Sequence, residues 1–281
     1  MNAKSIAVRQ PVAAVKTWSG SSLPVVSALN ALVPWLLPLA ALGLWQLSAS
    51  RGWLPPQILP APALVFSTLI ELVQGGEIGE GLRVSLFRIA TGLLIGTSCG
   101  LVLGGLIACS RRVGEYLNPT ITALAQIPSL GWVPILILMF GLDEIVKYFI
   151  IAKACFVPTV LATAEGIRGI PAHYLEVGRV LRLRRWTMLT KLIAPAALPT
   201  IFGGLRLAIS SAWIALIVVE MLAATEGIGY TMVWGRTLFQ IDIVIAGMIV
   251  VGLIGLLMDV VLTRVERRLR RWDPKAAGRV S

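Results

Sequence analysis

The stretch Ile89-Ala-Thr-Gly-Leu-Leu-Ile-Gly-Thr-Ser-Cys-Gly-Leu-Val-Leu-Gly-Gly-Leu-Ile-Ala-Cys109 decides the fold class. These 21 residues contain no charged side chain. An α-helix needs about 20 consecutive apolar residues to cross the roughly 30 Å of hydrocarbon in a bilayer. Arg88 directly precedes the stretch and Arg111 follows it closely, so charges bound it on both sides. The stretch therefore predicts a transmembrane helix.

Four glycines within this stretch recur at every fourth position: Gly92, Gly96, Gly100 and Gly104. Residues spaced by four lie on one face of a helix, and small residues there let a second helix approach closely in lipid. The spacing predicts a helix-packing face. Such a face would also permit one helix to slide along another, and the sequence leaves that second role open.

The composition extends this interpretation to the whole chain. Of 281 residues, 57% are hydrophobic and 14% are charged, against about 45–50% and 25% in average globular domains. The excess is concentrated in apolar stretches, which lie near 31–48, 89–109, 120–140, 145–164, 201–223 and 242–262. We predict an all-α, polytopic membrane protein with about six transmembrane helices, or five if segments within 120–164 merge.

The distribution of charge predicts the orientation. The net charge of +11 comes from 25 Lys and Arg against 14 Asp and Glu, and most of the basic residues fall on the side that carries both termini of a six-span chain. Because basic loops stay in the cytoplasm, we expect both termini there. The chain then divides into a cytoplasmic segment (1–30), a transmembrane domain (31–262) and a basic cytoplasmic tail (263–281). Membrane orientation explains the positive charge, and no nucleic-acid partner is needed.

The catalytic inventory is thin. The phosphate-binding pattern GxxxxGK[ST] and the hydrolase patterns HExxH and GxSxG do not occur, so we expect no nucleotide hydrolysis by this chain. We also expect no metal and no cofactor. The ionisable residues that we place well inside the predicted spans are Lys153, Glu220 and Asp259. Transport is therefore favoured over an intramembrane enzyme.

Lys153 is costly at its predicted depth. A charge at the centre of a span costs about 2.5–3.5 kcal/mol on insertion scales, so such a residue faces a partner or a cavity. Glu220 in the fifth predicted span is the obvious partner. The alternative is that Lys153 attracts an anionic substrate.

Prolines and polar residues lie at a similar depth. Pro128 and Pro134 are predicted to interrupt the third span, and Pro158 the fourth, because proline removes a backbone donor and kinks a helix. Hydroxyl and amide side chains accompany them, at Gln126, Ser129, Ser210 and Ser211. They predict either hydrogen bonds between helices or the polar lining of a substrate path.

The loop at 165–200 is the longest one on the cytoplasmic side and is strongly basic. Pro171 is suited to begin a helix, and residues 172–185 carry apolar side chains at helical spacing. A second helical piece from Trp186 should end where Pro195 and Pro199 prevent its continuation. The loop thus predicts a short helix–turn–helix, which could simply lie on anionic lipid.

This loop resembles the EAA loop of ABC-importer permeases, whose pattern is Glu-Ala-Ala-x3-Gly-x9-Ile-x-Leu-Pro. Glu176 takes the Glu position and Pro195 the final Pro, while Val177 and Gly178 stand for the two alanines. The chain departs from the pattern at Arg182, in place of Gly, and at Ala194, in place of Leu, and Leu192 stands for the Ile.

Other segments extend the resemblance from about Trp45 to Pro274. They are Ile58–Pro62, Ser85–Arg88, Ile127–Ser129, Phe140–Glu144 and Gly227–Tyr230. Together they are similar to the permeases that serve aliphatic sulfonates, taurine, nitrate and bicarbonate. The resemblance implies a bacterial inner-membrane ABC transporter subunit that is not itself an enzyme and that forms the path of a small anion.

The resemblance also implies partners. Two copies of the chain would form a homodimer, with two cytoplasmic ATP-binding subunits and one extracytoplasmic substrate-binding protein. The helix of Glu176 would be the coupling helix, with coupling residues Glu176, Gly178, Arg179, Arg182 and Pro195. A stand-alone secondary transporter or channel is the alternative. That class would carry an inverted repeat with charges near the midplane of both halves, and we find no convincing repeat.

Overall fold

The computed structural model describes residues 24–55 and 57–269, and within these ranges the secondary structure is helical, with no strand. The chain forms two units that divide between Trp53 and Leu54. The first unit contains α1 (Pro24–Ser50). This helix covers the predicted span 31–48 and extends beyond it at both ends.

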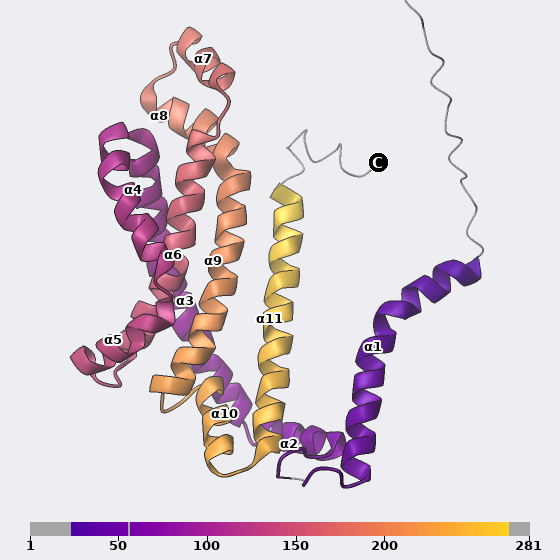
Figure 1. Cartoon of the computed structure of the whole chain (residues 1–281). Helices are drawn as coiled ribbons and strands as arrows, with labels where there is room; N and C mark the ends of the chain where they lie inside the picture. Colours follow the sequence, from indigo (N-terminus) through magenta and orange to yellow (C-terminus); the bar gives the residue numbers. More distant parts are fainter. Residues whose placement is uncertain (1–23, 56, 270–281) are drawn as a thin grey trace, which may run out of the picture. The chain divides into compact units, whose positions relative to one another are not determined.

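The second unit contains the rest of the helices (Figure 1). In chain order these are α2 (Pro62–Gln74), α3 (Glu77–Cys109), α4 (Arg111–Gln126), the 3₁₀ turn η1 (Ser129–Trp132), α5 (Val133–Phe140), α6 (Glu144–Arg168), α7 (Ala172–Val180), α8 (Arg185–Met188), the π-helical turn η2 (Leu189–Ile193), α9 (Ala194–Ala223), α10 (Ile228–Thr237) and α11 (Ile241–Leu269). The predicted tail, 263–281, begins inside α11, and its residues after Leu269 lie outside the described part.

Four stretches in the described part of the chain are long and apolar enough to cross a membrane: α3, α6, the continuous α8–α9 stretch, and α11. A fifth span is possible if α4 and the η1–α5 pair count as one, although they meet at a bend of 88°. The predicted span at 120–140 is thus divided by this bend at Pro128, one of its predicted interruptions, and the predicted count of six spans is not confirmed. The bend follows Gln126, where Ile127 and Pro128 adopt extended backbone.

Two of the predicted proline interruptions do not occur. Pro158 lies within α6, which continues to Arg168, and Pro134 lies in the first turn of α5, where no intrahelical donor is needed. The second helix of the basic loop does not end at Pro195 or Pro199 either, because α9 runs through both to Ala223. A proline removes a single N–H, and membrane helices tolerate that loss when neighbours satisfy the freed carbonyl.

The backbone of α3 packs directly on α6 along its glycines. Gly92, Gly96, Gly100 and Gly104 are all buried. A Cβ atom added at Gly92 would lie 2.5 Å from Ile151, and one added at Gly104 would lie 2.6 Å from the carbonyl oxygen of Val160. Any side chain on this face would therefore force the two helices apart.

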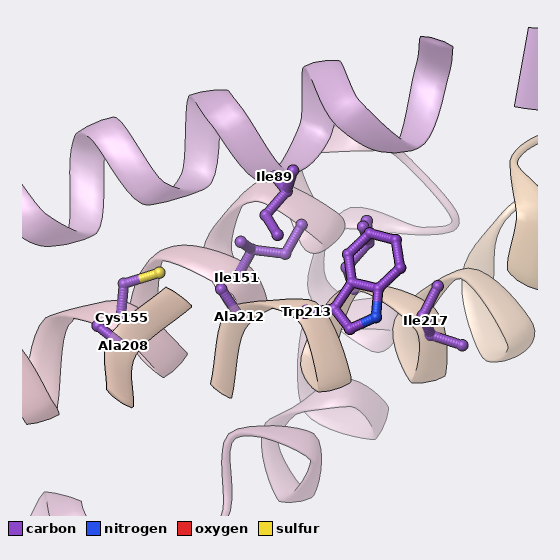
Figure 2. Close-up of a cluster of buried hydrophobic side chains, with 8 residues drawn as sticks. Ile89, Ile151, Cys155, Ala208, Ala212, Trp213 and Ile217 are labelled. Carbon is purple, nitrogen blue, oxygen red and sulfur yellow. The ribbon is translucent and has the colours of Figure 1, made fainter. Parts of the chain in front are cut away.

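On its other side α6 packs against α9. Ile89 of α3, Ile151 and Cys155 of α6, and Ala212 and Trp213 of α9 belong to one buried apolar cluster (Figure 2). These three helices form the centre of the unit. The helix α9 runs between two ends of the unit (Figure 1). We call the end where α9 begins, with α7, α8 and η2, the α7 end, and the end where α9 leads to α10 the α10 end.

Candidate functional site

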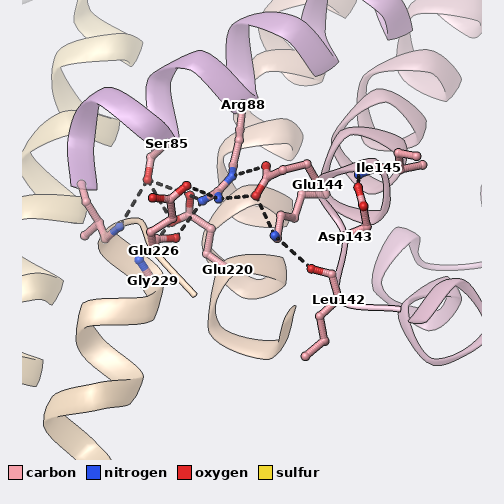
Figure 3. A network of polar contacts seen from close by, with 11 residues as sticks. Ser85, Arg88, Leu142, Asp143, Glu144, Ile145, Glu220, Glu226 and Gly229 are labelled. Atoms are coloured by element: carbon pink, nitrogen blue, oxygen red, sulfur yellow. Dashed lines mark hydrogen bonds and ion pairs between the residues drawn. The ribbon is translucent and has the colours of Figure 1, made fainter. Parts of the chain in front are cut away.

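Three of the segments singled out in the sequence meet at the α10 end, around the carboxylate of Glu220 (Figure 3). Ser85 and Arg88 come from α3, Glu144 begins α6, and the turn Gly227–Gly229 leads into α10. We call Ser85, Arg88, Glu144, Lys147 and Glu220, with the backbone of 226–229, the Glu220 network.

Arg88 is the centre of this network and is 1% exposed. Its Nε and Nη2 atoms donate to the two carboxylate oxygens of Glu144 at 2.8 and 2.6 Å, a bidentate pair. Its Nη1 atom donates to Glu220 at 3.0 Å and to the backbone carbonyl of Glu226 at 2.8 Å. One guanidinium thus joins α3, α6, α9 and the segment before α10.

Glu220 is equally enclosed. Its carboxylate accepts hydrogen bonds from the Ser85 hydroxyl at 2.8 Å and from the Gly229 N–H at 3.0 Å. Gly227 has a φ of +110°, and a Cβ atom there would lie 2.6 Å from the Glu220 carboxylate. Only glycine fits this position, which explains why the turn that covers Glu220 begins with one.

The charges of the network balance one another. Glu144 also accepts from Lys147 at 2.7 Å, and Lys147 is 2% exposed. Two carboxylates thus face two cations, and Glu226 lies at the rim, 3.5 Å from Arg88. Glu144 is partly exposed, at 41% of its side chain, whereas Arg88, Lys147 and Glu220 are buried. A paired cluster of this kind fixes the relative positions of the helices that it joins.

Lys153 lies apart from this network, and the predicted Lys153–Glu220 pair is wrong. The Lys153 ammonium donates to the backbone carbonyl of Ile127 at the bend after α4, and it lies 5.9 Å from the ring centroid of Trp132. It is 9% exposed and lines a cavity of about 350 Å³ together with Ser129 and Ser211. We call this the Lys153 cavity.

The remaining residues predicted to line the path lie elsewhere. Gln126 is exposed and does not line the Lys153 cavity. The Ser210 hydroxyl donates to the carbonyl of Arg206 within its own helix, beside Asp259 rather than Lys153. Of the six residues, the structure brings together Ser129, Lys153 and Ser211.

Sequence reasoning missed one further ion-pair cluster. Arg206 donates to Asp259 at 2.6 Å and to Glu266 at 2.9 Å, which joins α9 to α11. An arginine in the fifth predicted span opposite an acid in the sixth was the available signal. Within the described ranges, no group of three His, Cys, Asp or Glu side chains is arranged to hold a metal.

At the α7 end, α7 is shorter than the predicted helix at 172–185 and ends in a Schellman motif. The N–H of Leu183 donates to the carbonyl of Gly178 at 3.0 Å, and that of Arg182 donates to Arg179 at 2.9 Å. Arg182 has a φ of +49°, the left-handed conformation that glycine adopts most easily. The chain thus forms this turn with arginine at the position where the EAA pattern has glycine.

The surface of α7 is largely exposed. Glu176 and Arg179 are exposed, and so are the apolar side chains of Tyr174, Val177 and Val180. Gly178 is buried and faces Leu192 and Met188. Pro195 lies in the first turn of α9, directly after η2. The short helix is therefore held at one buried position, and its mixed apolar and charged face is open.

The sequence of the chain matches a family of known proteins. The sequence profile of the family described as "Binding-protein-dependent transport system inner membrane component" matches residues 96–271. The putative aliphatic sulfonates transport permease protein SsuC of Bacillus subtilis is 37% identical over 243 residues, covering 86% of this chain and 88% of that protein. Its Escherichia coli namesake is 37% identical over 251 residues (89% and 95%). The bicarbonate transport system permease protein CmpB of Synechococcus elongatus is 35% identical over 255 residues (84% and 88%).

The apolar helices and the match define a multi-pass membrane protein of the transport permease class. The chain belongs to the binding-protein-dependent transport system inner membrane component family. The resemblance inferred from the EAA-type loop and the flanking segments is thereby confirmed at the level of the family.

Proposed function

We propose that the chain is the transmembrane permease subunit of an ATP-driven ABC importer for a small anion, with an aliphatic sulfonate or taurine first and nitrate or bicarbonate next. The family supports the class, and the names of the sulfonate and bicarbonate relatives support the type of substrate. The chain forms the path and hydrolyses no ATP itself. Two copies pair with two ATP-binding subunits and one substrate-binding protein.

The observation that carries the coupling assignment is the form of α7. It is a nine-residue helix that is followed by the Schellman motif, with Arg182 in the left-handed position, and Gly178 packs it against η2. It exposes Glu176 and Arg179 beside Val177 and Val180, which suits a partner with both apolar and charged contacts. Such a helix moves as one body, so it can transmit closure of the ATP-binding subunits to the spans.

The orientation follows from the same assignment. The α7 end is cytoplasmic, as the basic residues of the loop indicate, and the α10 end faces the substrate-binding protein. Both termini then lie on the cytoplasmic side of the bacterial inner membrane. Binding of ATP draws the two α7 helices of the dimer together and converts the path from inward-facing to outward-facing.

Affinity purification in mild detergent tests the coupling assignment. The tagged chain is expressed with the products of its neighbouring genes, as wild type, Glu176→Arg or Glu115→Arg. Glu115 of α4 is also exposed and lines a pocket with Arg168, the last residue of α6 before α7, so its reversal is the matched control. We expect an ATP-binding subunit with wild type and Glu115→Arg and none with Glu176→Arg.

Uptake of a labelled sulfonate by cells that express the same variants should follow the same order. Normal uptake by Glu176→Arg contradicts the coupling assignment. An intact wild-type chain that purifies without any ATP-binding subunit contradicts the importer and supports a stand-alone transporter.

A further inference from the structure

Lys153 differs from the other lysine of its helix in what surrounds its charge. Lys147 bonds to the carboxylate of Glu144, whereas the bonded oxygen at Lys153 is the neutral carbonyl of Ile127. In the described part of the chain, no carboxylate lies within ion-pair distance of Lys153. It is nonetheless 9% exposed and lies about 14 Å along α6 from Glu144, given the rise of a helix per residue.

The surroundings compensate this charge only partly. Ile127 follows the last residue of α4, so its carbonyl belongs to the negative end of that helix dipole. The ring of Trp132 adds a weak cation–π contact at 5.9 Å. Both are partial charges, and a buried ammonium in a membrane calls for a full counter-charge or for water. A bound anion would supply one.

The Lys153 cavity has the chemistry for such an anion. Its volume of about 350 Å³ falls in the range of small-molecule sites. The hydroxyls of Ser129 and Ser211, from η1 and α9, also line it, and among the residues that the structure describes neither hydroxyl has a hydrogen-bond partner. The ammonium and two hydroxyls supply donors from three different elements.

The rest of the wall is apolar and indicates what accompanies the anionic group. Leu124, Val157, Ile214 and Ala215 line the same cavity. One cation with two neutral hydroxyls balances a single negative charge, so a monoanion fits better than a dianion. Apolar walls suit an alkyl tail, which nitrate and bicarbonate lack.

We propose that the Lys153 cavity is a transit site for a small organic monoanion with a short alkyl chain, with Lys153 binding its charged headgroup and Ser129 and Ser211 donating to it. This inference rests on the proposed function, because it assigns the site to the transported substrate. It makes Lys153 a determinant of charge selectivity inside the permease itself.

Binding is measured on the purified full-length chain alone, from the rise in its thermal unfolding temperature with sodium ethanesulfonate at constant ionic strength. Ethanesulfonamide, which has the same alkyl group without the charge, is the neutral probe, and sodium nitrate is the anion without a tail. The variants are Lys153→Met, Lys153→Arg, Ser211→Ala and Ser210→Ala. The two serines are adjacent, and only Ser211 lines the Lys153 cavity.

We expect saturable stabilisation of the wild type by ethanesulfonate, with weaker binding of nitrate and none of the sulfonamide. The half-saturating concentration should rise at least tenfold in Lys153→Met, rise several-fold in Ser211→Ala, and stay unchanged in Ser210→Ala. Lys153→Arg keeps the charge and should retain binding. If Lys153→Met does not fold, the two serine variants decide the question.

Three results would overturn the proposal: no saturable effect on the wild type, equal binding of sulfonate and sulfonamide, or equal binding by Ser211→Ala and Ser210→Ala. The assay contains neither an ATP-binding subunit nor a substrate-binding protein. A failure of the transit site therefore leaves the purification test of the importer unaffected, and a failure of the importer leaves the binding data interpretable.

Discussion

The α10 end and the α7 end of this permease are built in opposite ways. At the α10 end, Arg88 and Glu220 are almost completely buried, and each bonds to groups from more than one element. At the α7 end, a nine-residue helix is held by backbone hydrogen bonds and one buried glycine, and its polar and apolar side chains are exposed. The spans are thus fastened to one another at the α10 end and present an open surface at the α7 end.

This difference suggests that the α10 end contributes mainly to the stability of the fold and the α7 end mainly to contact with a partner. A buried, charge-balanced cluster fixes a geometry but offers little to a partner, whereas exposed side chains on a short capped helix cost little to rearrange. Regions that bind or move are drawn from the less stable parts of a protein. Changes at the α10 end should therefore affect folding first, and changes at the α7 end should affect partner contact first.

The largest effect should come from Arg88→Met, which breaks the α10 end. The substitution leaves Glu220 buried without its cation, and removing one partner of a buried pair typically costs about 3–5 kcal/mol. Denaturation of the purified chain in mixed micelles measures the loss. Arg111→Met is the matched control, because Arg111 also pairs with a glutamate, Glu115, but is exposed. Equal losses in the two variants would show that the network does not fasten this end.

The second effect concerns the α3–α6 seam that connects the two ends. A Cβ atom at Gly96 would overlap the carbonyl oxygen of Ala152, whereas one at Gly105 would meet nothing within 4 Å. Gly96→Ala should lower the free energy of unfolding by about 1–3 kcal/mol through overpacking. Gly105→Ala, in the same helix, should be neutral or slightly stabilising. Equal stability of the two variants would contradict close backbone packing.

The third prediction concerns a substitution that should stabilise the turn after α7. Arg182→Gly removes the cost of a left-handed backbone on a residue with a side chain and should stabilise the turn by about 1 kcal/mol. Hydrogen exchange of the Leu183 amide, which bonds to Gly178, measures the local gain. Arg179→Gly is the control, since a glycine inside α7 should speed that exchange. Slower exchange in both variants would indicate that the left-handed turn is not the source.

The sequence predicted the class of fold because the length of the apolar stretches and the positions of the basic residues are set by the membrane and can be read without knowing how the helices pack. It also indicated the segments of the site, since Ser85–Arg88 and Gly227–Tyr230 contact Glu220 directly and Phe140–Glu144 is joined to it through Arg88. It failed on the pairing of Lys153 with Glu220. Depth along a span can be counted from sequence, but the direction in which a side chain leaves its helix depends on how the helices pack.

The errors at the prolines have a related cause. The effect of a missing N–H depends on whether a neighbour can satisfy the freed carbonyl, which the sequence does not show. At the bend, the Ile127 carbonyl accepts from Lys153, 26 residues further along the chain, a contact that depends on how α6 packs there. At Pro158 the helix continues.

We expect the smallest effect on stability from Gly178→Ala, at the buried position of α7. The EAA pattern has alanine here, and an added Cβ would lie 3.4 Å from the side chains of Leu192 and Met188, at the near limit of ordinary contact. Because alanine favours a helix over glycine, we expect a gain of about 0.5 kcal/mol at this position near the end of α7. Exchange of the Leu183 amide measures it.

Gly178 and Arg182 belong to the same motif, since the carbonyl of Gly178 accepts from Leu183 directly after Arg182. Substitutions that share a hydrogen-bonded turn need not be additive. The change in stability of the double variant Gly178→Ala/Arg182→Gly should therefore differ from the sum of the changes in the two single variants. The changes in stability from Gly178→Ala and from Gly105→Ala on α3, which lies outside this turn, should add. If the changes in stability from Gly178→Ala and Arg182→Gly add, the two departures from the EAA pattern act independently. The left-handed turn at Arg182 and the buried contact at Gly178 would then be energetically separate.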